Sequence, residues 1–196
     1  GTILQSTDKG ITWNALTTGV TNALFDIDFP SNDTGYVVGM NGVMLKTTDA
    51  GITWNAVSTG ITTKIRAVDF TNVNHGVLVG DDGVIRRTVD GGQNWITFPF
   101  SSFYDVFDVK FRNDSIGYLM VQFDAYKTTD GGINWYKLGP ELRSVKYLND
   151  TTLIAVGDDM VRKSTDGGFT WTSQHPGQAP NWYDCAFPTQ DTGYIC

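Results

Sequence analysis

Five aspartates recur at a fixed place in this sequence, each two residues before a glycine and five residues before a tryptophan. Carboxylates can serve acid–base catalysis, or they can fix a turn by accepting hydrogen bonds from backbone N–H groups. Each aspartate lies in the pattern Ser/Thr-x-Asp-x-Gly-x-x-Trp, and the glycine can take φ angles closed to other residues. The pattern therefore favours a structural turn. Its members are Asp8, Asp49, Asp90, Asp130 and Asp166, with Trp13, Trp54, Trp95, Trp135 and Trp171.

A second set of residues mixes aromatic rings with guanidinium groups at one place of a longer repeat. The set comprises Phe25, Arg66, Phe107, Arg143 and Tyr183. Arginine binds carboxylates through charge-assisted hydrogen bonds and stacks on aromatic faces. A ring of these residues could bind an anionic or aromatic group, such as a carboxylate or a peptide terminus. The alternative is that they line a narrow channel and stack on one another.

Other catalytic chemistry has little support in the sequence. Glu141 is the single glutamate, whereas glycoside hydrolysis usually needs two carboxylates beside the bond. His75 and His175 are far apart, and His75 stands where another repeat has the turn residue Thr34. No Cys/His spacing typical of zinc occurs. We predict no enzyme activity, no cofactor and no metal site. Four paired acids could bind Ca²⁺, but we interpret them as solvated turn residues: Asp81, Asp82, Asp158 and Asp159.

The elements that position these residues repeat with the tryptophans, which lie 41, 41, 40 and 36 residues apart. A period near 40 indicates a repeat architecture. Each unit holds four short runs rich in β-branched and aromatic residues, bounded by turn residues. In the first full unit these runs are 24–29, 35–39, 43–47 and 53–58. Four strands in every repeat predict an all-β fold, a β-propeller of four-stranded antiparallel blades.

The eight-residue motif, as in "TTDGGINW" at 128–135, resembles the Asp-box, also called the bacterial neuraminidase repeat. The longer pattern, with "DTGYVVG" before the motif, resembles propellers of the photosystem II assembly-factor type and secreted bacterial propellers. Members of that family commonly have seven blades, more than this sequence offers. Sialidases with this repeat need an arginine triad, a tyrosine nucleophile and a nearby glutamate. The single glutamate here argues against that activity.

The two ends of the sequence each supply half a blade, because "GTILQSTDKGITWNAL" covers the third and fourth strands and "WYDCAFPTQDTGYIC" the first and second. We predict a five-bladed ring whose last blade is split between the termini. The alternatives are a piece of a larger propeller, or half-blades that pair between molecules. The predicted blades of this single domain are 182–196 with 1–19, 20–60, 61–100, 101–139 and 140–181.

The first strand of each blade is normally innermost, so the aromatic–arginine set is expected at the channel mouth. The residue two positions after each member of this set is expected in the core. These residues are Ile27, Val68, Val109, Val145 and Cys185. Cys185 and Cys196 fall on neighbouring strands, nearly opposite each other by counting from the turn. Cross-strand neighbours can approach disulfide distance. We therefore predict a disulfide, the alternative being two buried free cysteines.

The formal net charge is −7 and the basic residues are scattered, which argues against nucleic acid or an anionic membrane as partner. No stretch is long and apolar enough for membrane insertion. With the disulfide, the pattern predicts a secreted, periplasmic or cell-surface protein. We expect a non-catalytic recognition module for a protein or glycan. The alternatives are a self-assembling structural subunit of an extracellular assembly and, less favoured, a glycosidase.

Overall fold

The computed structural model describes residues 1–98, 104–122, 124–140, 142–149, 151–177, 181–189 and 191–196. Two compact units are distinguished along the chain. Unit 1 contains Gly1–Gly117 and Thr128–Asn134, and unit 2 contains Tyr118–Lys127 and Trp135–Cys196. We describe each unit by itself.

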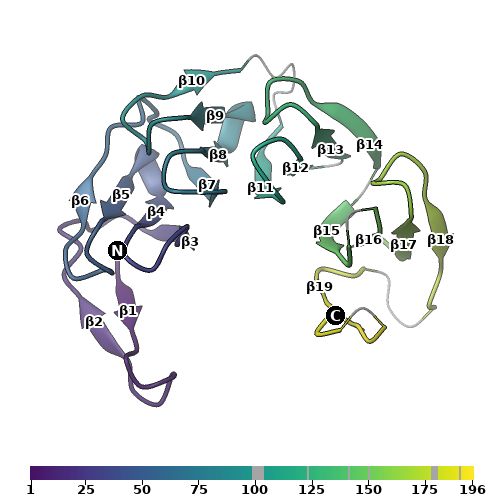
Figure 1. Cartoon of the computed structure of the whole chain (residues 1–196), viewed down its shortest axis with the longest axis horizontal. Helices are drawn as coiled ribbons and strands as arrows, with labels where there is room; N and C mark the ends of the chain where they lie inside the picture. Colours follow the sequence, from purple (N-terminus) through teal and green to yellow (C-terminus); the bar gives the residue numbers. More distant parts are fainter. Residues whose placement is uncertain (99–103, 123, 141, 150, 178–180, 190) are drawn as a thin grey trace. The chain divides into compact units, whose positions relative to one another are not determined.

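The described residues form antiparallel sheets of four strands joined in sequence order, and two-stranded sheets near each end (Figure 1). The first two four-stranded sheets are β3 (Leu24–Asp28), β4 (Gly35–Gly39), β5 (Met44–Thr47), β6 (Asn55–Ala56), and β7 (Ile65–Phe70), β8 (Gly76–Gly80), β9 (Ile85–Thr88), β10 (Ile96–Thr97). The next two are β11 (Val106–Phe111), β12 (Gly117–Val121), β13 (Asp124–Thr128), β14 (Tyr136–Pro140), and β15 (Leu142–Tyr147), β16 (Leu153–Gly157), β17 (Met160–Ser164), β18 (Thr172–Gln174). The two-stranded sheets are β1 (Ile3–Gln5) with β2 (Asn14–Leu16), and β19 (Cys185–Ala186) with β20 (Tyr194–Ile195).

These sheets confirm the predicted all-β propeller of four-stranded antiparallel blades, with half-blades at the two ends. In the first blade the predicted strands agree with the observed ones to within two residues at each boundary. The blade boundaries and the joining of the two half-blades into a fifth blade stay predictions. Short 3-10 turns, η1 (Met40–Gly42) and η2 (Asp81–Gly83), connect the second and third strands of the first two complete blades.

The second strand of each complete blade forms the centre of its core, since β4, β8, β12 and β16 are buried along their whole length. The first strands of successive blades adjoin in unit 1, because Asp28 of β3 accepts a hydrogen bond from the Phe70 N–H of β7 at 2.8 Å. Asp69 of β7 in turn accepts one from the Phe111 N–H of β11 at 2.7 Å. The innermost position of the first strand stays a prediction.

A tyrosine joins the first blade to the second. Tyr36 is fully buried and stacks on Phe70 with ring centroids 3.7 Å apart. Its hydroxyl donates toward the carbonyls of Val73 and Gly91, both at 3.1 Å, and the Lys46 ammonium donates to the same Gly91 carbonyl at 2.8 Å. The same arrangement occurs in unit 2, where Tyr118 and Lys127 both donate to the Gly167 carbonyl. A blade is thus bound to the motif turn of the following blade.

The expectation of a Cys185–Cys196 disulfide is wrong, because both thiols are free. The reason is register: Cys185 lies opposite Ile195, and Cys196 exchanges backbone hydrogen bonds with Asp184 instead. Successive side chains of a strand point to opposite faces, so a shift of one residue separates the two sulfur atoms. Cys185 is buried and Cys196 is exposed, and burial raises the pKa of the Cys185 thiol.

The Tyr36 hydroxyl should make the protein sensitive to alkali. Burial, followed by the charges of Asp28 and Asp90, raises the pKa of Tyr36 from 10.0 to about 12. A raised folded-state pKa gives stability that is complete below pH 10 and is lost as the pH rises toward 12. We expect Tyr36→Phe to lower the free energy of unfolding by about 1–2 kcal/mol at neutral pH, because it removes the hydroxyl's hydrogen bonds. Urea midpoints of both proteins should converge between pH 10 and 12; a constant difference across that range would contradict this role.

Candidate functional site

The repeated aspartates are engaged in closed networks of hydrogen bonds inside their own turns. In the second copy the Thr47 hydroxyl donates to Asp49 Oδ1 at 2.7 Å and accepts the Gly51 N–H at 2.9 Å. Asp49 Oδ1 also accepts the Thr53 N–H at 2.9 Å, and Oδ2 accepts the Thr53 hydroxyl at 2.6 Å. We call this arrangement the Asp-box clasp. It leaves the carboxylate committed to the turn, as the sequence predicted.

All five copies form the clasp. The opening hydroxyls and the aspartates that accept from them are Ser6 and Asp8, Thr47 and Asp49, Thr88 and Asp90, Thr128 and Asp130, and Ser164 and Asp166. The glycine two places after each aspartate has φ between +85° and +93°, which a side chain would strain. The predicted role of this glycine is therefore confirmed.

Sequence reasoning missed the residue before each tryptophan. That residue donates both its backbone N–H and its side chain to the aspartate, as Asn94 does to Asp90 at 2.9 and 2.8 Å. The signal was present in the sequence, because only Thr or Asn occurs there: Thr12, Thr53, Asn94, Asn134 and Thr170. Both side chains carry a donor, the Thr O–H or the Asn amide N–H, that reaches Oδ2 of the aspartate.

The tryptophans of the complete blades pack on their own blade or turn, and the tryptophan of the first half-blade differs. Trp54 meets Phe29 edge to face at 6.0 Å, and Trp95 meets Phe70 at 6.3 Å. Trp171 donates its indole N–H to the Gly168 carbonyl at 3.0 Å. Trp135 is partly buried, whereas Trp13, in the half-blade of β1 and β2, is 60 % exposed.

The hydrogen bonds of the clasp lower the pKa of each aspartate. Bonds from the backbone and side chain of Asn94, then from Thr88, lower the pKa of Asp90 to about 2. Bonds led by Thr12 and Thr53 lower the pKa values of Asp8 and Asp49 to about 2 as well. The pKa values of Asp130 and Asp166 are also lowered, for Asp130 against the opposing effect of burial. These carboxylates are anions at neutral pH and unsuited to act as general acids.

The predicted aromatic–arginine set divides between the units. In unit 1 the Arg66 guanidinium carbon lies 4.7 Å from the Phe107 ring centroid, and Lys64 lies 5.4 Å from that of Phe25. In unit 2 the Arg143 guanidinium carbon lies 5.0 Å from the Tyr183 ring centroid. The structure therefore confirms arginine–aromatic stacking within each unit.

The arginines of this set are already paired with acids. Arg66 donates from Nε to Asp81 Oδ1, and its Nη2 lies 2.7 Å from Asp105 Oδ2. Arg143 contacts Asp158 at 2.6 Å. These acids lie in turns between blades or between strands. Among the described residues, no group of three His, Cys, Asp or Glu side chains could hold a metal ion.

The column expected in the core is largely buried: Val68 and Val109 are at most 1 % exposed, and Cys185 is 2 % exposed. Ile27 departs from this expectation at 49 % exposure. It lines a cleft of about 230 Å³ with Phe25, Asp26 and residues of β1. Glu141 lies outside the described residues.

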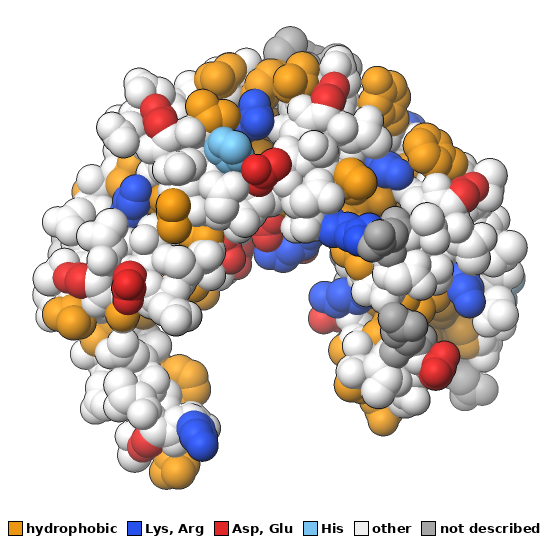
Figure 2. Space-filling view, viewed as in Figure 1, with side chains coloured by type: hydrophobic (Ala, Val, Ile, Leu, Met, Phe, Trp, Pro, Cys, Tyr) orange, Lys and Arg blue, Asp and Glu red, His pale blue; other side chains and the backbone are white. Residues whose placement is uncertain are grey.

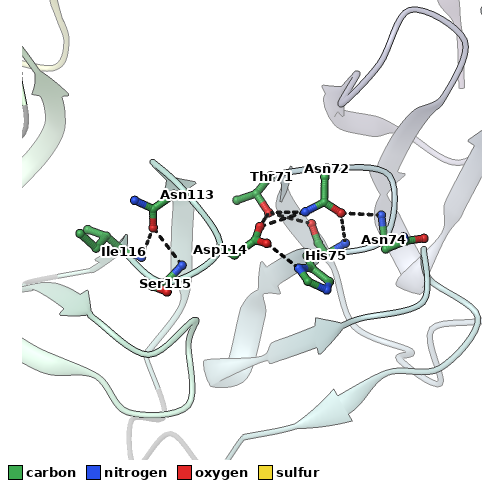
Figure 3. Close-up of polar contacts among 8 residues, drawn as sticks. All are labelled: Thr71, Asn72, Asn74, His75, Asn113, Asp114, Ser115 and Ile116. Atoms are coloured by element: carbon green, nitrogen blue, oxygen red, sulfur yellow. Dashed lines mark hydrogen bonds and ion pairs between the residues drawn. The ribbon is translucent and has the colours of Figure 1, made fainter.

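His75, which we interpreted as a turn residue, links two turns of unit 1. Its Nδ1 lies 2.8 Å from Asp114 Oδ2, while Thr71 and Asn72 donate to Oδ1 of the same carboxylate. Figure 3 shows these three side chains converging on Asp114 from the neighbouring turn. The histidine thus helps hold the turns after β7 and β11 together.

The clasps and the four-stranded sheets define the protein as an Asp-box repeat β-propeller, similar to the photosystem II assembly-factor type. Residues 5–100 match the family model described as Photosynthesis system II assembly factor YCF48. No curated protein matches the chain by sequence.

Similar solved structures include YCF48 bound to D1 peptide, 18 % identical with a TM-score of 0.56, covering 92 % of this chain and 91 % of that one. YCF48 from Cyanidioschyzon merolae is 24 % identical with a TM-score of 0.67, over 87 % of this chain and 62 % of that one. An ancestral GH74 enzyme is 19 % identical with a TM-score of 0.75, over 93 % of this chain but 29 % of the enzyme. At these identities the likeness shows the fold.

The expectation of a secreted, periplasmic or cell-surface protein is wrong. The matching family model and two of these structures describe photosystem II assembly factors, which are not secreted surface proteins. The disulfide that supported the expectation is absent as well. No helix among the described residues has the length and apolar character needed to span a membrane.

The clasp should make stability depend on pH in the acid range. The pKa of Asp90 in the folded protein, about 2, lies below the ordinary aspartate value of 3.8, so the clasp gives stability that is present above pH 4 and is lost as the pH falls toward 2. We expect Asp90→Ala to lower the melting temperature by a few degrees at neutral pH, and the difference from the parent to shrink between pH 4 and 2. Asp33→Ala, at an exposed turn aspartate, is the matched control. A loss of ligand binding with unchanged melting would contradict the structural role.

Proposed function

We propose that the protein is a non-catalytic, protein-binding propeller that holds a peptide segment against its first strands. The observation that carries the proposal is the set of aromatic rings that stack with a cation, Arg66, Arg143 or Lys64, and stay accessible. Phe25 is 45 %, Phe107 44 % and Tyr183 61 % exposed. Exposed aromatic side chains beside arginine are typical of protein interfaces, where they contribute large buried areas on binding.

The charged groups of the site support recognition rather than catalysis. Arg66 and Arg143 are oriented by carboxylates, so their planar faces rest on aromatic rings while their edges are engaged. Such rigid groups lose little conformational entropy when a partner binds. Hydrolysis of a glycan would need two free carboxylates flanking the bond. The Asp-box carboxylates do not meet that need, because each one is held within its own turn.

The comparisons support a protein partner. One similar structure, YCF48 bound to D1 peptide, aligns over 92 % of this chain and 91 % of its own length. We infer that this chain also binds a peptide segment of a protein partner. A glycan ligand and self-assembly into a structural array are the alternatives.

Peptide phage display on the full chain tests the proposal. We expect selected peptides to bind the parent and to lose about tenfold or more in affinity to the triple variant Phe25→Ala, Phe107→Ala, Tyr183→Ala, because truncated hot-spot aromatics cost more than about 1.4 kcal/mol. Tyr136→Ala on β14, where the ring is 58 % exposed, is the matched control and should bind normally.

Three results would contradict the proposal. The first is selected peptides that bind the triple variant as tightly as the parent. The second is release of reducing sugar from xyloglucan by the parent chain, which would indicate a glycosidase. The third is concentration-dependent assembly that the same triple variant abolishes, which would show that the aromatic residues serve self-association.

A further inference from the structure

A cluster of acids surrounds one lysine on the first strands of unit 1. We call it the inner-strand cluster, and it comprises Asp26, Asp28, Asp69, Asp108 and Lys110. Lys110 Nζ lies 3.3 Å from Asp69 Oδ1. Burial would lower the pKa of Lys110, but the charges of Asp69, Asp108 and Asp26 outweigh it and raise that pKa. Burial raises the pKa of Asp28, with a further contribution from Asp26. These effects show that the five side chains share one electrostatic environment.

Negative charge is in excess among Asp26, Asp28, Asp69 and Lys110, since three carboxylates face one ammonium group. Asp26 and Asp28 accept hydrogen bonds from neutral backbone N–H groups of β7, at 2.9 and 2.8 Å, and Asp26 also accepts the Ile27 N–H of its own strand at 2.9 Å. Those bonds satisfy the oxygens without cancelling their charge. Figure 2 shows acidic and basic side chains side by side near β7 and β11.

The arginine of the same unit does not reverse this balance. Arg66 is bound by both Asp81 and Asp105, and Lys64 lies 3.8 Å from Asp81. Two cations are therefore matched by two carboxylates. An anionic ligand at Arg66 would have to displace these carboxylates and would also meet the inner-strand cluster. The sequence-based expectation of an anion at this mouth is thus unfavourable in unit 1.

Apolar surface adjoins the acids. Phe25 and Phe107 are nearly half exposed, and the cleft beside β3 brings Phe25, Ile27 and Leu4 next to Asp26. A side chain bound there would meet an apolar wall with a carboxylate at its edge. Lysine and arginine have this complementary character, because an apolar stem carries a cationic end group.

We infer, building on the proposed function, that the partner segment bound by β3, β7 and β11 is a basic peptide with interspersed aromatic or aliphatic residues. Its cations face the inner-strand cluster, and its apolar side chains cover Phe25 and Phe107. Charge complementarity of this kind chooses the partner and speeds association more than it adds affinity.

Two capped hexapeptides test the inference with the full chain, one alternating Lys with Phe and the other alternating Glu with Phe. Binding is measured by fluorescence anisotropy at low and high salt. We expect the Lys–Phe peptide to bind more tightly and to weaken with salt. The double variant Asp26→Asn, Asp28→Asn should weaken it roughly fivefold, the size expected for two partly screened charge pairs. Asparagine keeps a hydrogen-bond acceptor, so melting should change little.

Lys110→Gln should have the opposite effect on affinity. Removing the cation increases the excess negative charge, so the Lys–Phe peptide should bind more tightly. Asp33→Asn, in the turn between β3 and β4, is the charge-matched control and should leave binding unchanged. Tighter binding of the Glu–Phe peptide, or weaker Lys–Phe binding to Lys110→Gln, would overturn the inference. If Glu–Phe binding then depends on Phe25 and Phe107, the proposed function survives; if no binding depends on them, it fails as well.

Discussion

The hydrogen-bond clasp of the Asp-box is the interaction on which the rest of this structure depends. A buried hydroxyl, such as that of Thr88, both donates to the aspartate and accepts the glycine N–H four residues on. The turn then fixes the strand that follows and places its tryptophan on the blade. The carbonyl of Gly91, inside this turn, receives the tyrosine and lysine of the preceding blade. One turn therefore organises its own blade and its contact with a neighbour.

Because the clasp uses its carboxylates fully, the motif is a poor place for chemistry, and the binding that we propose falls to the first strands. Those strands carry their own acids for two purposes. Asp28 and Asp69 bridge successive strands through backbone N–H groups, yet they remain charged groups in a partly buried place. Burial raises the pKa of both carboxyl groups, because an ionised carboxylate loses hydration when it is partly buried. In our proposal the same charges make the binding surface negative.

The repeat made the fold predictable, since tryptophan spacing and turn residues recur with little variation. The clasp aspartates were predictable for the same reason. Features that depend on register or on distant pairs were not. Cys185 and Cys196 differ by one residue of register, which counting from a turn could not resolve. The acids that neutralise Arg66 come from separate turns, at Asp81 and Asp105, and no local pattern in the sequence connects them to it.

The central claim is that the first strands bind the partner while the Asp-box turns only support the fold. Hydrogen exchange measured by mass spectrometry, with and without the Lys–Phe hexapeptide, tests it most directly. The account predicts slower exchange in peptides covering β3, β7 and β11, with the five Asp-box turns unchanged. Protection confined to the Asp-box turns, with the first strands unaffected, would contradict it.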